Sequence, residues 1–175
     1  MLRLYSYETV FREVPEEITL ALNLSECPHH CDGCHSPWLW GNEGMELTIE
    51  KIDELLSLPK HKAVTCLCFM GGDNDPKAVI EMNKLVKEHD PIIKTCWYTG
   101  YTYAELEHIG CSHKIFEFDY VKIGPYIKEL GPIDKEGSNQ VMFMRTSHVS
   151  MKNITSKFRK NWTKTPAPEM AAGIS

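Results

Sequence analysis

Short apolar runs and amphipathic stretches follow one another along this chain. Four apolar runs predict buried strands, and they lie at 18–24, 63–70, 92–98 and 116–123. Between them, apolar residues recur at helical spacing, which predicts helices at 49–56, 76–86 and 103–109. A strand that alternates with a helix in this way is typical of an α/β protein with a mostly parallel sheet.

Capping residues support two of the predicted helices. Thr48 is placed to cap the first helix, which Pro59 ends, and Asp75 with Pro76 forms a capping residue and first helical position for the second. A closed eight-stranded barrel takes about 250 residues, and this chain has 175. We therefore expect an open, incomplete (βα) barrel in a single domain at 1–160. The composition of 161–175 predicts a disordered tail.

Every loop with unusual chemistry follows a predicted strand. These loops are the cysteine-rich segment 27–35, Gly71–Asp73, Thr99–Gly100 and Gly124–Pro125. Because the carboxyl ends of parallel strands meet at one edge of a sheet, we expect the four loops to converge on one cavity.

Composition narrows the class of protein. A hydrophobic content of 42 % can supply a core without disulfides or a structural metal, and a net charge of −5 gives no reason to expect binding to nucleic acid. No run approaches the ~20 apolar residues that span a bilayer, and the first residues do not resemble a signal peptide. We expect a cytoplasmic protein with neither nucleic acid nor membrane as a partner.

The segment C-P-H-H-C-D-G-C-H places Cys27, Cys31 and Cys34 in one short loop. A 4Fe-4S cubane usually takes four cysteine ligands, so three would leave one iron open to a small molecule. A zinc site with one of the neighbouring histidines as fourth ligand is the alternative, although zinc modules more often use paired C-x2-C spacings. The histidines themselves, His29, His30 and His35, are expected to hydrogen-bond within the loop. The other cysteines, Cys66, Cys68, Cys96 and Cys111, are predicted core thiols.

The C-x3-C-x2-C loop resembles the signature of the radical-SAM superfamily, and Gly71-Gly72-Asp73 resembles its glycine-rich strand end. The resemblance implies one 4Fe-4S cluster on the three cysteines and S-adenosylmethionine as second cofactor. In that superfamily the reduced cluster cleaves S-adenosylmethionine to give a 5′-deoxyadenosyl radical. Residues implied to bind S-adenosylmethionine are Gly33, Cys34, His35, Gly71, Gly72 and Asp73. Asp73 stands where the family often has Glu, which shortens the reach of the carboxylate.

Longer segments resemble the activating proteins of anaerobic ribonucleoside-triphosphate reductases. They include C-L-C-F-M-G-G-D-N-D-P, C-W-Y-T-G-Y and F-D-Y-V-K-I-G-P-Y-I-K-E-L-G-P-I. This resemblance implies an oxidoreductase that generates a glycyl radical on the large reductase subunit, with reduced flavodoxin as electron donor. No acid–base pair is identifiable, and hydrogen transfer to a radical needs none. Ile123 replaces the family's usual Asp, and no Arg follows Gln140, so roles of those side chains are in doubt. An activase of a different glycyl-radical enzyme, or another small radical-SAM enzyme, remains an alternative.

Overall fold

Four parallel strands form the centre of an eight-stranded sheet in the computed structural model, which describes residues 1–156. They are β2 (Thr19–Leu24), β4 (Cys66–Met70), β5 (Lys94–Tyr98) and β6 (Tyr120–Ile123), adjacent in that order. Each lies within one of the four apolar runs, so the hydrophobic pattern located these strands correctly. The predicted end of the domain at 160 and the tail at 161–175 lie outside the described residues.

Antiparallel strands flank this centre on both sides. β1 (Arg3–Val10) pairs with β2 and with β3 (Met45–Glu46), while β7 (Val141–Ser147) pairs with β6 and with β8 (Ser150–Asn153). The expectation of a mostly parallel sheet is therefore wrong, because three of the seven pairings are parallel and four are antiparallel. The links from β1 to β2 and from β7 to β8 are too short for a crossover helix. Within residues 1–156 the sheet is open, with β3 and β8 at its edges.

The helices begin where their capping residues predict. In α1 (Ile49–Ser57), Thr48 Oγ1 accepts a hydrogen bond from Lys51 N, and the helix ends before Pro59. In α2 (Pro76–His89), Asp75 Oδ1 accepts from Ala78 N at 3.1 Å. The short helix α3 (Tyr103–His108) begins at a capping box formed by Thr102 and Glu105. Three 3-10 helices complete the elements of residues 1–156: η1 (Pro37–Trp40), η2 (Pro59–His61) and η3 (Ser112–Glu117).

Three strands are shorter than the apolar runs that predict them. The run 116–123 was expected to be one strand, but Phe116 lies in η3 and β6 begins at Tyr120. The reason is local, because the N–H of Phe118 bonds to the carbonyl of Ile115 and closes a turn before the strand starts. Similarly, Val64 N bonds to His61 O, so β4 starts after this turn. β5 likewise starts at Lys94, not at 92.

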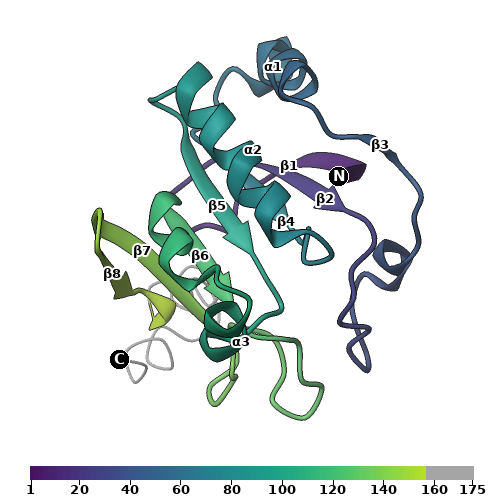
Figure 1. The fold of residues 1–175 in the computed structure, drawn as a ribbon, viewed down its shortest axis with the longest axis vertical. Helices are drawn as coiled ribbons and strands as arrows, with labels where there is room; N and C mark the ends of the chain where they lie inside the picture. Colours follow the sequence, from purple (N-terminus) through teal and green to yellow (C-terminus); the bar gives the residue numbers. More distant parts are fainter. Residues whose placement is uncertain (157–175) are drawn as a thin grey trace.

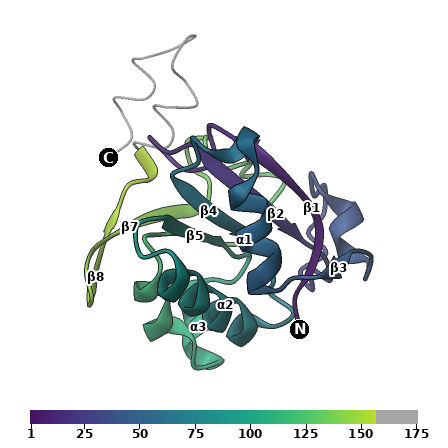
Figure 2. The ribbon, with the colours of Figure 1, turned by 90° about the horizontal axis from the view of Figure 1, so that it is seen from above.

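The helices cover one face of the sheet, as Figure 1 and Figure 2 show. On that face Phe69, Trp97 and Val121 from the central strands pack with Val79 and Leu106 from the helices. The opposite face has its own smaller core, formed by Cys66, Cys68, Cys96, Tyr120, Met142 and neighbouring residues. All four cysteines outside the loop are buried, which confirms their prediction as core thiols. No helix in the described residues is long and apolar enough to cross a membrane.

Candidate functional site

The four loops that follow the parallel strands meet at one edge of the sheet. Together they line an open hollow of about 210 Å³. The segment after β2 contributes the three loop cysteines, and the segment after β4 contributes Gly71 and Asp73. Gly100 follows β5, and Gly124 follows β6. The expected convergence of the loops is confirmed.

Backbone hydrogen bonds fold the cysteine loop back on itself. Cys27 N donates to Leu39 O and Glu26 N donates to Gly41 O, which closes the loop at its base through η1. At its tip Cys34 N donates to Cys31 O, and Gly33 between them has a φ of +69°, a conformation that glycine adopts without strain. Cys27, Cys31 and Cys34 are all partly exposed and unpaired, and each lines the hollow.

The thiols lie in a partly desolvated environment. Burial raises the pKa of Cys27, a backbone hydrogen bond at His29 opposes this, and the nearby Asp73 carboxylate adds to the rise. Cys34 Sγ accepts a hydrogen bond from Ser36 N at 3.3 Å. A thiolate in such a site needs nearby positive charge, because burial disfavours the charged form.

Asp73 joins three of the loops. Its Oδ2 lies 2.8 Å from Nε2 of His29 and accepts a hydrogen bond from the N–H of Gly100 at 2.7 Å. The hydroxyl of Tyr101 donates to the Asp73 carbonyl, and the ring of Tyr101 meets the His29 ring edge-on. The other carboxylate oxygen, Oδ1, is buried and has no hydrogen-bond partner in the described residues. This orphan acceptor is suited to a donor on a bound molecule.

Glycine is required at two places beside this carboxylate. A Cβ on Gly100 would lie 2.5 Å from Cδ2 of His29, so only glycine leaves room for the histidine ring. A Cβ on Gly72, whose φ is +84°, would lie 2.5 Å from Cγ2 of Val79. Gly72 thus lets α2 pack closely against the end of β4.

Lys122 of β6 also lines the hollow. It is only 9 % exposed, and its Nζ donates to Gly124 O at 3.3 Å and lies 5.4 Å from the centre of the Tyr98 ring. Burial lowers its pKa to about 8, against the attraction of Asp73 and Cys31, which raises it. No carboxylate within residues 1–156 forms an ion pair with this ammonium group.

Not every residue implied to bind S-adenosylmethionine lines the hollow. Cys34, Gly71 and Asp73 do, whereas Gly33, His35 and Gly72 are not among its lining residues. Gly33 faces Lys128 and Tyr126, and the ring of His35 lies 4.9 Å from that of Tyr126. Their roles stay predictions.

Sequence reasoning missed His29 and Lys122. It expected His29 to bond within its own loop, which is wrong, since its partner Asp73 is 44 residues away. Lys122 sits inside a predicted strand, and its one sequence signal is a charge in an otherwise apolar run, V-K-I. Gln140, left in doubt, lines the hollow and donates from Nε2 to Gly124 O, while Ile123 lies in the core.

A parallel sheet edge that gathers three thiols into one hollow defines an iron–sulfur type of site. Comparison with known families agrees: the model of the 4Fe-4S single cluster domain matches residues 17–142. The chain belongs to this family. The match to the family confirms the prediction of a single 4Fe-4S cluster. No curated protein and no solved structure matches the chain significantly.

The donor set fits this cluster. Thiolates are the usual ligands of iron–sulfur clusters, and Cys27, Cys31 and Cys34 are the cysteines among the described residues that line the hollow. In residues 1–156 no three His, Cys, Asp or Glu side chains are grouped so that they could hold a single metal ion. A cubane offers a separate iron to each cysteine, so its ligands need not converge on one point. The three cysteines would hold the cluster with one ligand position left open.

Proposed function

We propose that the protein is a radical-SAM activase that generates a glycyl radical on an anaerobic ribonucleoside-triphosphate reductase. One observation carries this proposal: the three cysteines line an open hollow at the carboxyl edge of β2, β4, β5 and β6, beside Gly71 and Asp73. Three thiolates leave a cluster iron free for a second cofactor, and this edge is where α/β sheets bind ligands. The open sheet with helices on one face is what we propose to be an incomplete radical-SAM barrel.

The residues around the hollow divide the binding of S-adenosylmethionine between them. We assign the amino N–H groups of its methionyl part to the orphan Oδ1 of Asp73 and the backbone of Gly71, since a buried carboxylate oxygen without a partner favours a hydrogen-bond donor. His29 and Gly100 hold the opposite oxygen of Asp73, which fixes the carboxylate in place. Gly33, Cys34, His35 and Gly72 complete the proposed cofactor-binding set.

When bound on the three cysteines, the cluster would supply the electron that cleaves S-adenosylmethionine, and the chemistry would leave an adenosyl radical able to take a hydrogen from a glycine Cα of the reductase. The chain's own residues bind and orient the reactants. Because the hollow is open to solvent, a loop of the large reductase subunit could reach it. Reduced flavodoxin is the proposed electron donor, and the cytoplasm is the proposed location.

The test begins with anaerobic reconstitution of the full chain with iron and sulfide. The reduced protein is incubated with S-adenosylmethionine, and 5′-deoxyadenosine is measured by chromatography. We expect product from the wild type and from Cys111→Ala, which removes a buried thiol far along the chain from the loop. We expect none from Cys31→Ala. Adding the reductase subunit should then give a glycyl-radical signal in electron paramagnetic resonance.

Each alternative gives a different result. Product without a glycyl radical on the reductase would indicate a radical-SAM enzyme with another target. A colourless protein that binds stoichiometric zinc through the three cysteines and cleaves no S-adenosylmethionine would indicate an interaction module and would contradict the proposal.

A further inference from the structure

Lys122 is a buried cation without an ionic partner in the described part of the chain. The residue is only 9 % exposed, and within residues 1–156 its ammonium donates one hydrogen bond, to the carbonyl of Gly124. Buried ammonium groups are costly unless paired, and proteins rarely keep them without a reason. The fold alone therefore does not account for this lysine.

The charge of the Asp73 carboxylate attracts Lys122, but the two groups do not form an ion pair. Asp73 Oδ2 is held by His29 and by the Gly100 N–H, and no ion pair joins this carboxylate to Lys122. The Tyr98 ring offers its face at 5.4 Å, a contact that offsets only part of the cost of burying a cation. An anion that enters the hollow would supply the missing charge.

The loop cysteines line the same hollow as Lys122, and Cys31 is among the groups whose charge acts on it. We propose that Lys122 provides the compensating positive charge for the thiolate-ligated 4Fe-4S cluster and raises the reduction potential of that cluster. This inference rests on the family membership of the chain and not on the proposed activase function.

The physical reason is electrostatic. Adding an electron makes the cluster more negative, and a nearby ammonium stabilises the reduced form more than the oxidised form. In a partly buried site water screens this interaction poorly, so one charge changes the potential measurably. Net charge and hydrogen bonding around a cluster are among the factors that set its potential.

The test is a redox titration of the reconstituted protein, monitored by electron paramagnetic resonance, without S-adenosylmethionine. We expect Lys122→Met to shift the midpoint potential to more negative values and Lys122→Arg to restore it toward the wild type. Lys128→Met is the matched control: it removes a lysine that packs beside the same loop but is 60 % exposed, so water and salt screen its charge. This control should leave the potential unchanged.

Iron and sulfide analysis ensures that only fully loaded proteins are compared, and Lys122→Gln serves if the methionine variant does not load. A neutral variant with the wild-type potential would overturn the proposal. So would a shift that appears only when S-adenosylmethionine is present, because the partner anion would then be the cofactor's carboxylate. Since no activity is measured, a failed proposal of activase function would leave this result interpretable.

Discussion

The Nε2 atom of His29 lies 2.8 Å from Oδ2 of Asp73, which connects the cysteine loop to the end of β4. Both side chains are largely buried, and the same carboxylate oxygen also accepts the Gly100 N–H. The loop after β2, which carries the predicted cluster ligands, is thereby held against the loops after β4 and β5. This contact positions the cysteines without ligating the cluster.

Because the His29 ring packs against Gly100, the effects of substitutions at these two positions should depend on each other. We expect His29→Ala to cost about 1–3 kcal/mol in the free energy of unfolding, because it removes one of the two hydrogen bonds to the buried Asp73 carboxylate. Gly100→Ala should destabilise the wild type, since its Cβ would contact the ring at 2.5 Å. In the His29→Ala background the same change should cost much less.

Urea unfolding of the four cluster-free proteins measures this coupling. The surface variant His148→Ala, which lies in the exposed β7–β8 turn, serves as control. Strictly additive effects of the two substitutions would show that the ring and Gly100 do not contact each other as described.

Lys122→Met should stabilise the cluster-free protein at neutral pH. The folded pKa of Lys122 is lowered to about 8, whereas the unfolded pKa is near 10.4. The folded state therefore binds fewer protons between these values, and wild-type stability should rise as pH increases through this window. Below pH 8 the buried charge costs the folded state about 3 kcal/mol by the same relation.

The measurement is the difference in unfolding free energy between wild type and Lys122→Met, by urea at several pH values from 7 to 10. The variant should be more stable at pH 7, and the difference should shrink toward pH 10. A less stable variant at pH 7 would mean that the lysine has a structural role.

The central strands and capped helices could be predicted because their signals are local. The strand β4 is apolar throughout, and the adjacent residues Asp75 and Pro76 mark the start of α2. β1 carries a mixed pattern in which Leu4 is buried and Tyr5 exposed, and it is placed by pairing with β2 rather than by its own composition. The sequence contains no comparable local signal for the antiparallel pairing of strands at the two sides of the sheet.

The three loop cysteines were equally readable as a candidate cluster site, because their spacing is a property of one short segment. His29 and Lys122 were not, since each acquires its role from residues that only the fold brings near. A lysine between Val121 and Ile123 alternates with core residues and would ordinarily face solvent. It is buried because the face of β6 that it shares with Tyr120 carries the smaller core, with Tyr98 packed beside the ammonium group.

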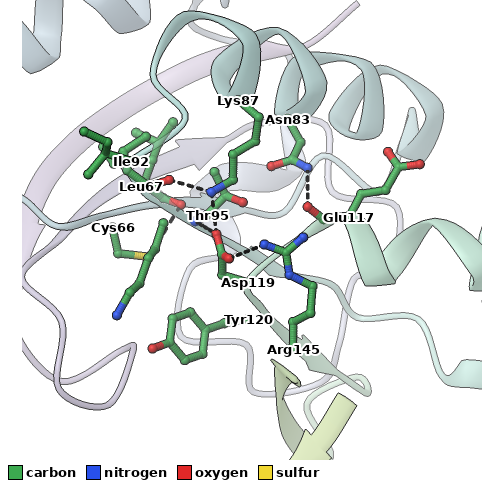
Figure 3. A network of polar contacts seen from close by, with 12 residues as sticks. Cys66, Leu67, Asn83, Lys87, Ile92, Thr95, Glu117, Asp119, Tyr120 and Arg145 are labelled. Atoms are coloured by element: carbon green, nitrogen blue, oxygen red, sulfur yellow. Dashed lines mark hydrogen bonds and ion pairs between the residues drawn. The ribbon is translucent and has the colours of Figure 1, made fainter. Parts of the chain in front are cut away.

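A second charged network should matter for stability but not for the cluster. Asp119 accepts hydrogen bonds from Lys87 Nζ, Arg145 Nη2 and the Thr95 N–H, as Figure 3 shows. Burial raises its pKa, but these bonds and the charges of Lys87 and Arg145 outweigh it, so the pKa of Asp119 is lowered. Its contribution is complete above its unfolded pKa of about 3.9 and is lost as pH falls through the folded pKa.

We expect Asp119→Asn to cost about 1–3 kcal/mol at pH 7 and to differ less from the wild type in acid. Glu117→Gln is the matched control, since its ion pair with Lys114 is exposed and should contribute little. Urea unfolding at pH 7 and pH 3 checks both variants, and iron content should be unchanged. An unaltered stability at pH 7 would contradict the role given to this network.

In the proposed site, three cysteines hold a 4Fe-4S cluster with one iron open to S-adenosylmethionine. Electron-nuclear double resonance tests this central claim most directly. The reduced wild-type protein is mixed with S-adenosylmethionine labelled with nitrogen-15 in its amino group or oxygen-17 in its carboxylate. Hyperfine coupling of the cluster to both labels is the predicted result. A fully loaded, reduced cluster that couples to neither label would contradict it.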